Sequence, residues 1–519
     1  MAIWLALCLP ALPLQLAERA LVAPAATAIA VVDGPAQRPQ VLCCSDAARA
    51  AGVAPGQKLA EAQALCAELL PLQRDPGRER EALLELACWA YQFSHQVVTF
   101  ESALPGGAGG VLIETAGSQR LFAGRDALHR RIARELRSLG YRGASTGHAP
   151  TPRAARWIAL ARLAKLADLQ PRDASSAAAL PEALAPLPLR LLEWDAATTS
   201  ALHALGLQTI GDLLRLPRAG FARRFDPRRL DELDQALGNR PDPQPAFTPP
   251  EHFAARLELP ADLVDAAQLL PAAQRLLAAL EGYLRGRGAG AAELAFTAHH
   301  NPRRAVPTPP TRIGLNLAAP ERDAARLGQL LAERLTRVRL AEPAISLELE
   351  VERLLPFDAI NGSLLPPAAG PDAGTERDDW LPLAETLHAR LGSERVFQMH
   401  VVDDHRPEYA QRIATIALDP GGGSPAGAAT SPPAQPRPLL MLRTPRALPC
   451  RDETPQYRGA LALLAGPERI ESGWWDLGDA RRRAVHRDYF VARNPAGQTL
   501  WVYRELAAPR GWFLHGFFA

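Results

Sequence analysis

Residues that could bind a metal or act as acids and bases are grouped at few points in this 519-residue chain. One such group is Asp403, Asp404 and His405, whose oxygen and nitrogen atoms are suitable metal ligands. No second group of such residues accompanies it. We therefore favour a polar loop in which Arg406 and Glu408 are paired, with a metal site as the alternative.

Histidine and cysteine residues elsewhere lack the spacing of a metal site. His299 and His300 are adjacent in a predicted strand, so their rings point to opposite faces of a sheet. The chain has no CxxC pair and no histidine at ligand spacing, so we expect no cofactor and, in the cytoplasm, reduced thiols. The six cysteines are Cys8, Cys43, Cys44, Cys66, Cys88 and Cys450.

The first twenty residues, "MAIWLALCLPALPLQLAERA", allow two interpretations. A secretory signal has basic residues before an uninterrupted apolar segment. Here the first basic residue is Arg19, and Pro10 and Pro13 interrupt the apolar segment. The small residues at 23–28 resemble a cleavage site and keep the signal peptide open as an alternative. We favour a buried strand that ends at Pro10, in a cytoplasmic protein.

Composition excludes a disordered or strongly basic protein. Hydrophobic residues make up 47% of the chain and the net charge is +2. A chain of this length forms about three or four domains, and any nucleic-acid contact must come from local basic patches. No apolar run reaches the roughly 18 residues that span a bilayer, so we expect no membrane contact.

The pattern of the sequence changes along the chain and predicts an α+β multidomain fold. The first 165 residues alternate strands and helices, and residues 185–240 are helical. A proline-rich stretch at 240–250 marks a boundary, after which strands and helices alternate again. Residues 419–438, rich in Gly, Pro and Ala, predict a flexible linker before a compact tail.

Two features could contact DNA. The turn with Gly206 and Gly211 resembles a helix-hairpin-helix, whose backbone amides can bind a phosphate. Arg303, Arg304 and Arg312 lie in the next predicted domain and could follow a phosphate backbone. The alternatives are a hairpin that binds nothing and a solvated sheet face.

Residues 48–69, "ARAAGVAPGQKLAEAQALCAEL", resemble the fingers segment of Y-family translesion DNA polymerases. The order of the later segments is similar to that family's right hand, over residues 1–355. Five residues match fixed positions of the fingers motif: Arg49, Gly52, Gly56, Glu61 and Ala62. The resemblance implies palm (1–20, 80–165), fingers (21–79), thumb (166–242), little finger (243–356), a clamp-motif linker with the DDHRPE segment (357–418), the flexible linker (419–438) and a C-terminal partner-binding domain (439–519).

The acids that hold two catalytic metal ions in this family are missing here. Nothing acidic precedes Glu18, although the family carries acids at the end of its first strand. In the second cluster only Glu114 remains, on a structural position. The resemblance therefore implies a protein that is not an enzyme. The lost acids align near Leu9, Ala11, Gly109 and Gly110.

The residues that hold the incoming nucleotide are also depleted. Arg49 matches the family's triphosphate-binding arginine, but Asp46 replaces a tyrosine and would repel a phosphate. Pro152 replaces a lysine near the start of a helix that keeps Arg156.

Four further motifs are similar to an inactive branch of the family found in bacterial mutagenesis cassettes. They are the apolar start "LALCLPALPLQLAER", "DDHRPE" (403–408), "GPERIESGWW" (466–475) and "GWFLHGFFA" (511–519). The resemblance implies a non-catalytic adaptor in SOS-induced translesion synthesis and mutagenesis. Its partners would be primer-template DNA, bound weakly, the sliding clamp, an error-prone C-family polymerase and an ImuA-like, RecA-related protein.

Relatives in that branch carry a short clamp-binding motif after the little finger. The best match is "NGSLL", with Asn in place of Gln and Leu in place of Phe, and a plain linker is the alternative. Its residues are Asn361, Gly362, Ser363, Leu364 and Leu365.

The aromatic residues of the tail predict either the core of a small domain, a base-stacking platform or a surface that binds partners. We expect Trp512 to point inward and Phe517 and Phe518 outward. Arg481–Arg483 could meet DNA or an acidic partner. The predicted partner-binding residues are Trp474, Trp475, Trp512, Phe513, Phe517 and Phe518.

Two other functions stay open. An active Y-family polymerase could use displaced acids such as Asp33, Glu101 or Glu114. A protein that binds DNA structures without a polymerase partner is the second alternative.

Overall fold

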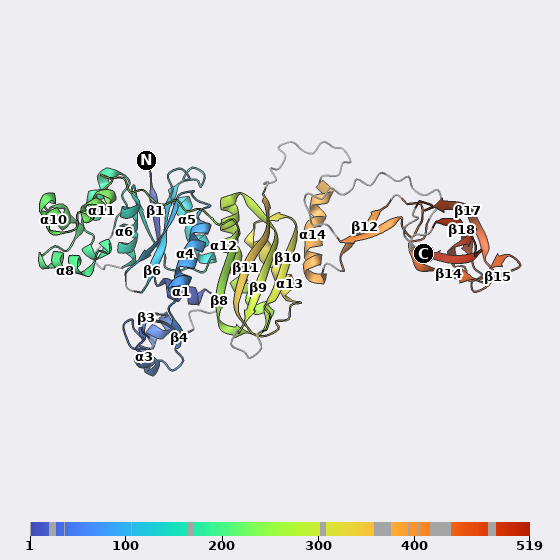
Figure 1. Ribbon diagram of the computed structural model, residues 1–519, viewed down its shortest axis with the longest axis horizontal. Helices are drawn as coiled ribbons and strands as arrows, with labels where there is room; N and C mark the ends of the chain where they lie inside the picture. Colours follow the sequence, from blue (N-terminus) through green and yellow to red (C-terminus); the bar gives the residue numbers. More distant parts are fainter. Residues whose placement is uncertain are drawn as a thin grey trace. The chain divides into compact units, whose positions relative to one another are not determined.

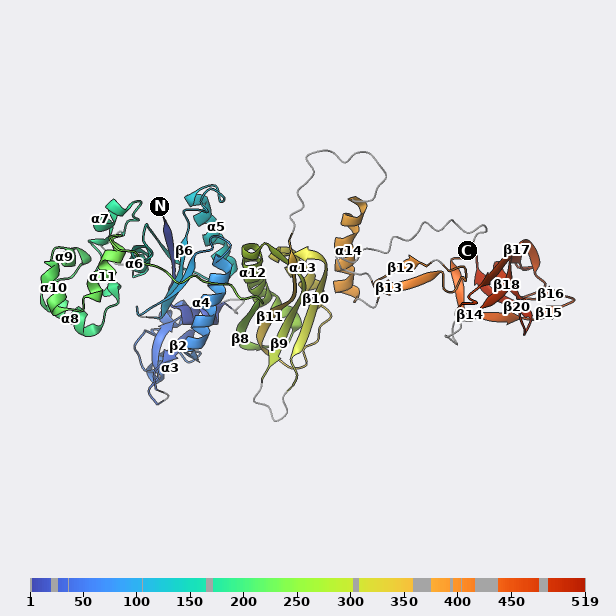
Figure 2. The ribbon, with the colours of Figure 1, turned by 45° about the horizontal axis from the view of Figure 1, so that its top comes forward.

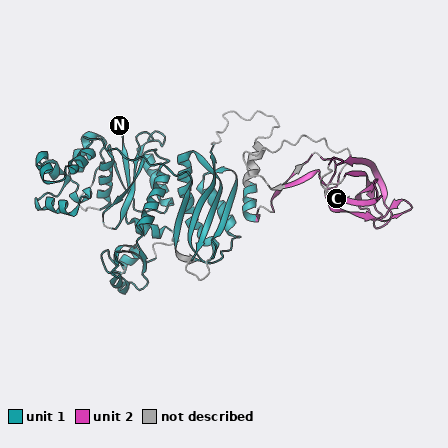
Figure 3. Cartoon of the chain, in the orientation of Figure 1, with its two compact units in different colours: residues 1–390 teal, residues 391–519 magenta. Residues whose placement is uncertain are grey.

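The computed structural model describes residues 2–19, 27–35, 37–104, 106–164, 171–301, 308–357, 375–392, 395–402, 404–415, 437–475 and 484–518. The chain forms two compact units, residues 1–390 and 391–519 (Figure 3). Helices in the described part of the chain are all too short or too polar to cross a lipid bilayer.

A four-stranded antiparallel sheet forms the palm-like part of the first unit (Figure 1). Strand β1 lies inside it and is buried along its whole length. Leu5, Leu7 and Leu9 enter one hydrophobic core, and the alternate residues Trp4 and Cys8 enter another. The predicted strand before Pro10 is thus confirmed. In sheet order the strands are β5 (Val97–Ser102), β6 (Ala108–Glu114), β1 (Trp4–Leu9) and β7 (Ser145–Ala149).

Helices cover both faces of this sheet because both faces are apolar. Residues of α4 and α5 share the core of Leu5 and Leu7, whereas α6 shares the core of Trp4 and Cys8. These helices are α1 (Leu12–Glu18), α4 (Pro76–Ala90), α5 (Arg125–Ser138) and α6 (Pro152–Leu163).

The fingers-like part is a small sheet with two short helices. Strand β2 lies in its middle, antiparallel to β3 and parallel to β4. Its elements are β2 (Ile29–Asp33), β3 (Gln40–Cys44), α2 (Asp46–Ala50), α3 (Leu59–Leu65) and β4 (Leu70–Gln73).

The thumb-like part is helical and shares a core with α6, through residues such as Leu184 and Leu202. Its elements are η2 (Ala177–Ala179), α7 (Leu180–Leu184), η3 (Leu189–Leu192), α8 (Ala196–Ala204), α9 (Ile210–Leu214), α10 (Arg218–Arg224) and α11 (Arg228–Ala236).

The little-finger-like part has helices on one face of an antiparallel sheet in the order β10-β9-β11-β8. Helix α12 packs against α4, and a Cβ added at Gly282 would come within 2.4 Å of the Trp89 ring. Arg285 of α12 also pairs with Glu135 of the neighbouring α5 at 3.5 Å. The elements are β8 (Ala254–Leu263), η4 (Ala266–Leu269), α12 (Leu270–Arg287), β9 (Ala289–His300), β10 (Thr311–Glu321), α13 (Ala324–Leu335) and β11 (Ala344–Pro356).

A further helix, α14 (Thr375–Leu391), lies in the segment 357–418 that we expected to be a linker. Its Glu385 is buried and pairs with Arg326 of α13, and Ala389 belongs to the core of the first unit. The expectation is thus wrong for this helix, because packing against α13 stabilises a segment whose own sequence pattern is weak.

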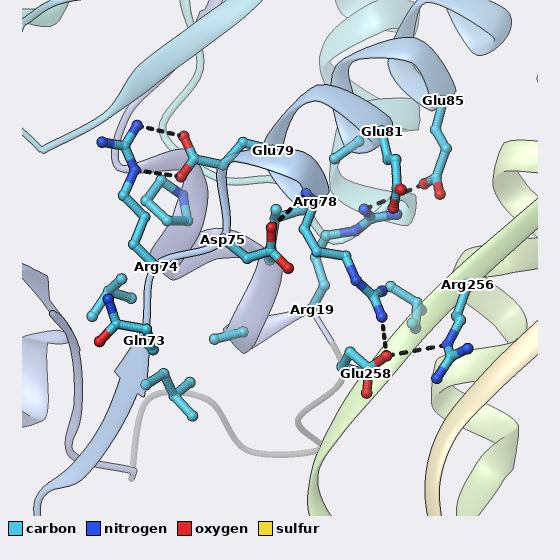
Figure 4. Close-up of a pocket in the computed structure, with 17 residues that line it drawn as sticks. Arg19, Gln73, Arg74, Asp75, Arg78, Glu79, Glu81, Glu85, Arg256 and Glu258 are labelled. Atoms are coloured by element: carbon cyan, nitrogen blue, oxygen red, sulfur yellow. Dashed lines mark hydrogen bonds and ion pairs between the residues drawn. The ribbon is translucent and has the colours of Figure 1, made fainter. Parts of the chain in front are cut away.

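A cavity of about 460 Å³ lies where α1, α4 and β8 meet (Figure 4). Glu258 contacts Arg78 and accepts a 3.1 Å hydrogen bond from Arg256. Arg74 donates to Glu79 at 2.6 Å. Neighbouring acids thus neutralise these three arginines. The ion pairs around the cavity hold parts of the fold together, and the arginines are not available to bind an anion.

The second unit contains a hairpin and a five-stranded antiparallel sheet in the order β14-β20-β19-β18-β17 (Figure 2). Both faces of this sheet are covered by apolar side chains, including Leu500 on one face and Trp501 on the other. The strands are β12 (Phe397–Val401), β13 (Gln411–Thr415), β14 (Leu440–Leu448), β15 (Cys450–Arg451), β16 (Thr454–Pro455), β17 (Ala462–Ser472), β18 (Val485–Arg493), β19 (Thr499–Glu505) and β20 (Gly511–Phe517).

Candidate functional site

The positions to which the resemblance assigns the lost acids meet at one end of the palm-like sheet. Leu9 of β1 is paired with Gly109 of β6, and Cys8 with Gly110. A Cβ at Gly110 would lie 1.8 Å from the Leu7 carbonyl oxygen, so no side chain fits there. This end of the sheet has no room at Gly110 for the carboxylate that a metal site would need.

Apolar groups occupy the surroundings. Leu9 is fully buried, and a Cβ at Gly109 would lie 3.3 Å from Leu83 and 3.4 Å from Leu12. Burial raises the pKa of the nearby Cys8 thiol to about 12, so Cys8 is a neutral core residue and no nucleophile. In the described part of the chain, no group of three or more His, Cys, Asp or Glu residues could hold a metal ion.

The displaced acids of the polymerase alternative do not converge. Glu101 is paired with Gly109, whereas Glu114 is paired with Trp4 at the opposite end of β1. Five residues of strand separate these ends, about 17 Å. Asp33, in the fingers-like part, pairs with Arg74 at 3.1 Å.

The remnant of the nucleotide site is neutralised locally. The Arg49 guanidinium donates a 2.7 Å hydrogen bond to Asp46, three residues earlier in α2. It also donates to the Cys44 carbonyl oxygen at 3.3 Å. Arg49 is exposed but already carries a counter-charge, which weakens its attraction for a triphosphate.

Helix α6 begins at Pro152, the position where the resemblance places a nucleotide-binding lysine, and here this residue has a structural role. Pro152 is buried in the first turn of α6, where its missing N–H costs nothing. Arg156 of α6 contacts Glu193 of the thumb-like part and donates to the Glu101 carbonyl oxygen at 2.8 Å. This ion pair ties thumb to palm and leaves Arg156 engaged within the protein.

The predicted helix-hairpin-helix is present, but its amides are occupied. The amides of Gln208 and Thr209 donate to the Asp212 carboxylate at 3.0 and 2.9 Å. These bonds hold the pKa of Asp212 well below its usual range. The Gly206 amide donates to a carbonyl of α8, and the Gly211 amide to the Ala185 carbonyl at 2.8 Å. Phosphate contact at Gly206 and Gly211 would have to displace these bonds, so the geometry does not favour it.

The little-finger arginines are only partly described. Arg303 and Arg304 lie outside the described residues. Arg312 is exposed and pairs with Glu352. The face of the sheet that carries Arg312 holds more acidic than basic residues in its described part, which disfavours a phosphate backbone. Its charged residues are Arg256, Arg312, Arg353, Glu258, Glu293, Glu348, Glu350 and Glu352.

The adjacent histidines of β9 have separate environments, as predicted. His299 contacts Glu348 at 2.7 Å, whereas His300 contacts Thr311 at 2.9 Å. A shared ligand role for the two rings is not supported.

The DDHRPE segment forms the loop between β12 and β13. Arg406 is 1% exposed and pairs with Asp404 at 2.7 Å, and Glu408 pairs with Arg487 of β18 at 2.9 Å. The predicted polar loop is present with different pairs, because Arg406 faces inward and Glu408 toward the sheet. Asp403 lies outside the described residues.

The aromatic tail residues fall into two groups. Trp474 and Trp475 are 72% and 54% exposed and contact each other edge to face at 5.4 Å. The residues of β20 and its end pack on the sheet instead. Trp512 contacts Phe490, Phe513 stacks on Tyr503, Phe517 contacts Tyr457, and Phe518 packs beside Trp501.

We expected Phe517 and Phe518 to point outward, and this is wrong. Phe517 ends β20 and Phe518 follows it, and the two side chains pack on opposite faces of a sheet that is covered on both sides, so both are half-buried. The predicted clamp residues Asn361–Leu365 and Arg481–Arg483 lie outside the described residues.

The chain is similar to several known proteins. Residues 17–159 match the model of the impB/mucB/samB family. Solved structures similar to the chain include DinB from Sulfolobus solfataricus (15% identity, TM-score 0.35, 67% of this chain and 98% of that one). An insertion ternary complex of Dbh DNA polymerase is another (14% identity, TM-score 0.36, 67% and 98%). The fold is that of a Y-family polymerase-like right hand with a C-terminal extension.

The match to curated proteins is longer. The chain is 30% identical over 487 residues to Protein ImuB of two Caulobacter vibrioides strains, NA1000 / CB15N and ATCC 19089 / CIP 103742 / CB 15. The alignment covers 90% of this chain and 100% of each relative. The chain belongs to the ImuB family.

Sequence reasoning missed three features of these sites. The Glu193–Arg156 pair joins residues 37 positions apart and leaves no local pattern. The capping role of Asp212 was readable from Thr209 three residues before it, a capping box. The exposed apolar face of the β12–β13 hairpin could not be recognised from the sequence, because the strands are short and divided by the DDHRPE loop.

Proposed function

We propose that the chain acts in translesion DNA synthesis as a non-catalytic adaptor in the cytoplasm. It links damaged primer-template DNA, the sliding clamp and an error-prone C-family polymerase, together with an ImuA-like, RecA-related protein. The observation that carries the proposal is the apolar end of the palm-like sheet, where Leu9, Gly109 and Gly110 replace acids. A polymerase without these acids cannot position two metal ions.

In this proposal the thumb-like part contacts DNA through the end of α10 and the start of α11. Arg223 and Arg224 at the end of α10 and Arg228 at the start of α11 are exposed. Among the described residues, none of the three has an acidic partner. Replacing Arg223 and Arg224 with Glu should weaken DNA binding and reduce its salt dependence, whereas Gly206→Ala should have a smaller effect.

Protein recruitment is assigned to the second unit and to the clamp motif. Trp474 and Trp475 are the exposed aromatic pair of that unit, and Trp is enriched at binding hot spots. Leu364 and Leu365 remain our candidates for clamp binding.

Co-purification tests the adaptor proposal. The full chain and a chain that ends at residue 391, which retains α14, are compared as bait for clamp, C-family polymerase and the ImuA-like protein. We expect the shorter chain to lose polymerase or the ImuA-like protein and to keep the clamp. Leu364→Ala with Leu365→Ala in the full chain should lose the clamp alone. Retention of every partner by the shorter chain would exclude recruitment by the second unit.

A further inference from the structure

The hairpin of β12 and β13 stands apart from the five-stranded sheet of its unit (Figure 2). In the described part of the chain, each of its strands pairs only with the other. Each strand therefore has a free edge of backbone N–H and C=O groups, which is a template for another strand.

The loop of this hairpin is fixed to the sheet. The buried Arg406 guanidinium lies so close to Gly473 that a Cβ there would be 2.3 Å from Nη1. Glu408 is bound by Arg487, which also donates to Glu505 at 3.1 Å. The hairpin is thus held at one end by three buried or paired charges, although it has only two strands.

One face of the hairpin is apolar and open to solvent. Met399 and Ile413 are directly paired across the strands and are 65% and 63% exposed. Phe397, two residues before Met399 and on the same face, is 51% exposed. A two-stranded hairpin with such a face is marginal in water, and a third strand would stabilise it.

The opposite side of the hairpin carries a cation. Arg412 precedes Ile413 in β13 and therefore belongs to the other face. Arg395, two residues before Phe397 and outside β12, is also exposed but has the spacing of the apolar side. Neither arginine has an acidic partner among the described residues, whereas Asp404 and Glu408 of the loop are already neutralised.

We infer that the free edge of β13 accepts an extended segment of a partner protein in which apolar and acidic residues alternate. Backbone pairing would hold the segment, its apolar side chains would cover Met399 and Ile413, and its acids would face Arg412. The exposed Trp474 follows Gly473, the residue on which Arg406 of the loop packs. This inference rests on the proposed function, since it names how the second unit recruits a protein.

Charge favours this occupant over a second copy of the chain. Two hairpins joined at β13 would bring Arg412 residues of the same sign together, which is unfavourable across strands. A basic or neutral segment would leave Arg412 without a counter-charge.

Binding of purified C-family polymerase and ImuA-like protein to the full chain tests the inference. The variants are Met399→Asp with Ile413→Asp, and separately Arg412→Glu. Leu464→Asp is the matched control, because Leu464 of β17 is a similarly exposed apolar residue of the same unit. Thermal unfolding of each variant shows whether the second unit remains folded.

We expect the double variant to weaken binding of one partner at least tenfold and Arg412→Glu at least fivefold, with Leu464→Asp unchanged. Three outcomes would overturn the inference and leave recruitment by the second unit intact. The hairpin variants could bind the partners as tightly as the unaltered chain does, Arg412→Glu could bind them more tightly, or the variants could lose only the association of two copies of the chain. If the unaltered chain binds neither protein, recruitment by the second unit and the inference both fail.

Discussion

Leu9 of β1 lies directly opposite Gly109 of β6, at two of the positions where we propose that metal-binding acids have been lost. Leu9 is fully buried, and the space beside Gly109 is filled by Leu83 and Leu12. The end of the sheet has become part of the hydrophobic core. Restoring an acid would therefore bury a charge and would not rebuild a metal site.

Gly110→Asp should prevent normal pairing of β1 with β6, because the first side-chain atom would overlap the Leu7 carbonyl oxygen. We expect a loss of more than about 3 kcal/mol in the free energy of unfolding, measured with denaturant. Gly117→Asp is the control, since a Cβ there meets nothing within 4 Å. Equal stability of the two variants would contradict the strand geometry described here.

Gly282→Ala tests the packing of α12 on α4. Alanine normally stabilises a helix relative to glycine by about 1 kcal/mol, but here its Cβ would press on Trp89. We expect destabilisation of residues 1–390 by about 2 kcal/mol. Gly328→Ala in α13, with no neighbour nearer than 3.9 Å, should be neutral or stabilising. Thermal unfolding of both variants provides the comparison, and a stabilised Gly282→Ala would show that the helices are further apart.

Much of the first unit could be predicted from the sequence, because its apolar segments and its motifs are local. The apolar residues before Pro10 predicted β1. What could not be predicted depends on contacts between distant residues. Helix α14 is stabilised by the Arg326–Glu385 pair across 59 positions.

For the predicted sites, too, the sequence identified residue types but not the contacts that each residue makes. Sequence identified Arg49 and Arg312 as cations, but not that Asp46 and Glu352 neutralise them. Residue type indicated that the aromatic residues of the tail form either a core or a binding surface. Only the sheet distinguishes the exposed Trp474 from the packed Phe517.

Gly473→Ala should loosen the β12–β13 loop. Gly473 and Gly497 both have positive φ, +85° and +84°, so alanine is strained at either position. Only at Gly473 would the new Cβ also meet Arg406. We expect Gly473→Ala to lower the unfolding free energy of residues 391–519 by about 1–3 kcal/mol more than Gly497→Ala. Matching losses would show that Arg406 does not pack on Gly473.

Acid should destabilise the first unit through His148. This side chain is 3% exposed and its ring lies 4.1 Å from that of His129. Burial lowers the pKa of His148 to about 4, from an ordinary value near 6.5. Between these values the unfolded chain binds a proton that the folded chain excludes. The free energy of unfolding therefore falls as the pH decreases, by up to about 1.4 kcal/mol per pH unit.

His148→Phe should flatten this dependence for residues 1–390, measured by thermal unfolding from pH 7 to pH 4. The second unit is an internal control. Burial also lowers the pKa of its His515 to about 4, and the His148 substitution leaves His515 in place, so the pH dependence of the second unit should not change. An unaltered slope for the first unit would show that His148 is not the group that titrates.

The most direct test of the central claim is primer extension by the purified chain. Template, primer and all four nucleotides are supplied with Mg²⁺ or Mn²⁺, beside an active Y-family polymerase as the positive control. We propose that the protein, without acids at Leu9, Gly109 and Gly110, cannot hold the two metal ions that phosphoryl transfer requires. We predict no extension above the protein-free background with either metal. Template-dependent incorporation that disappears in Glu101→Ala or Glu114→Ala would contradict the account and identify the chain as an active polymerase.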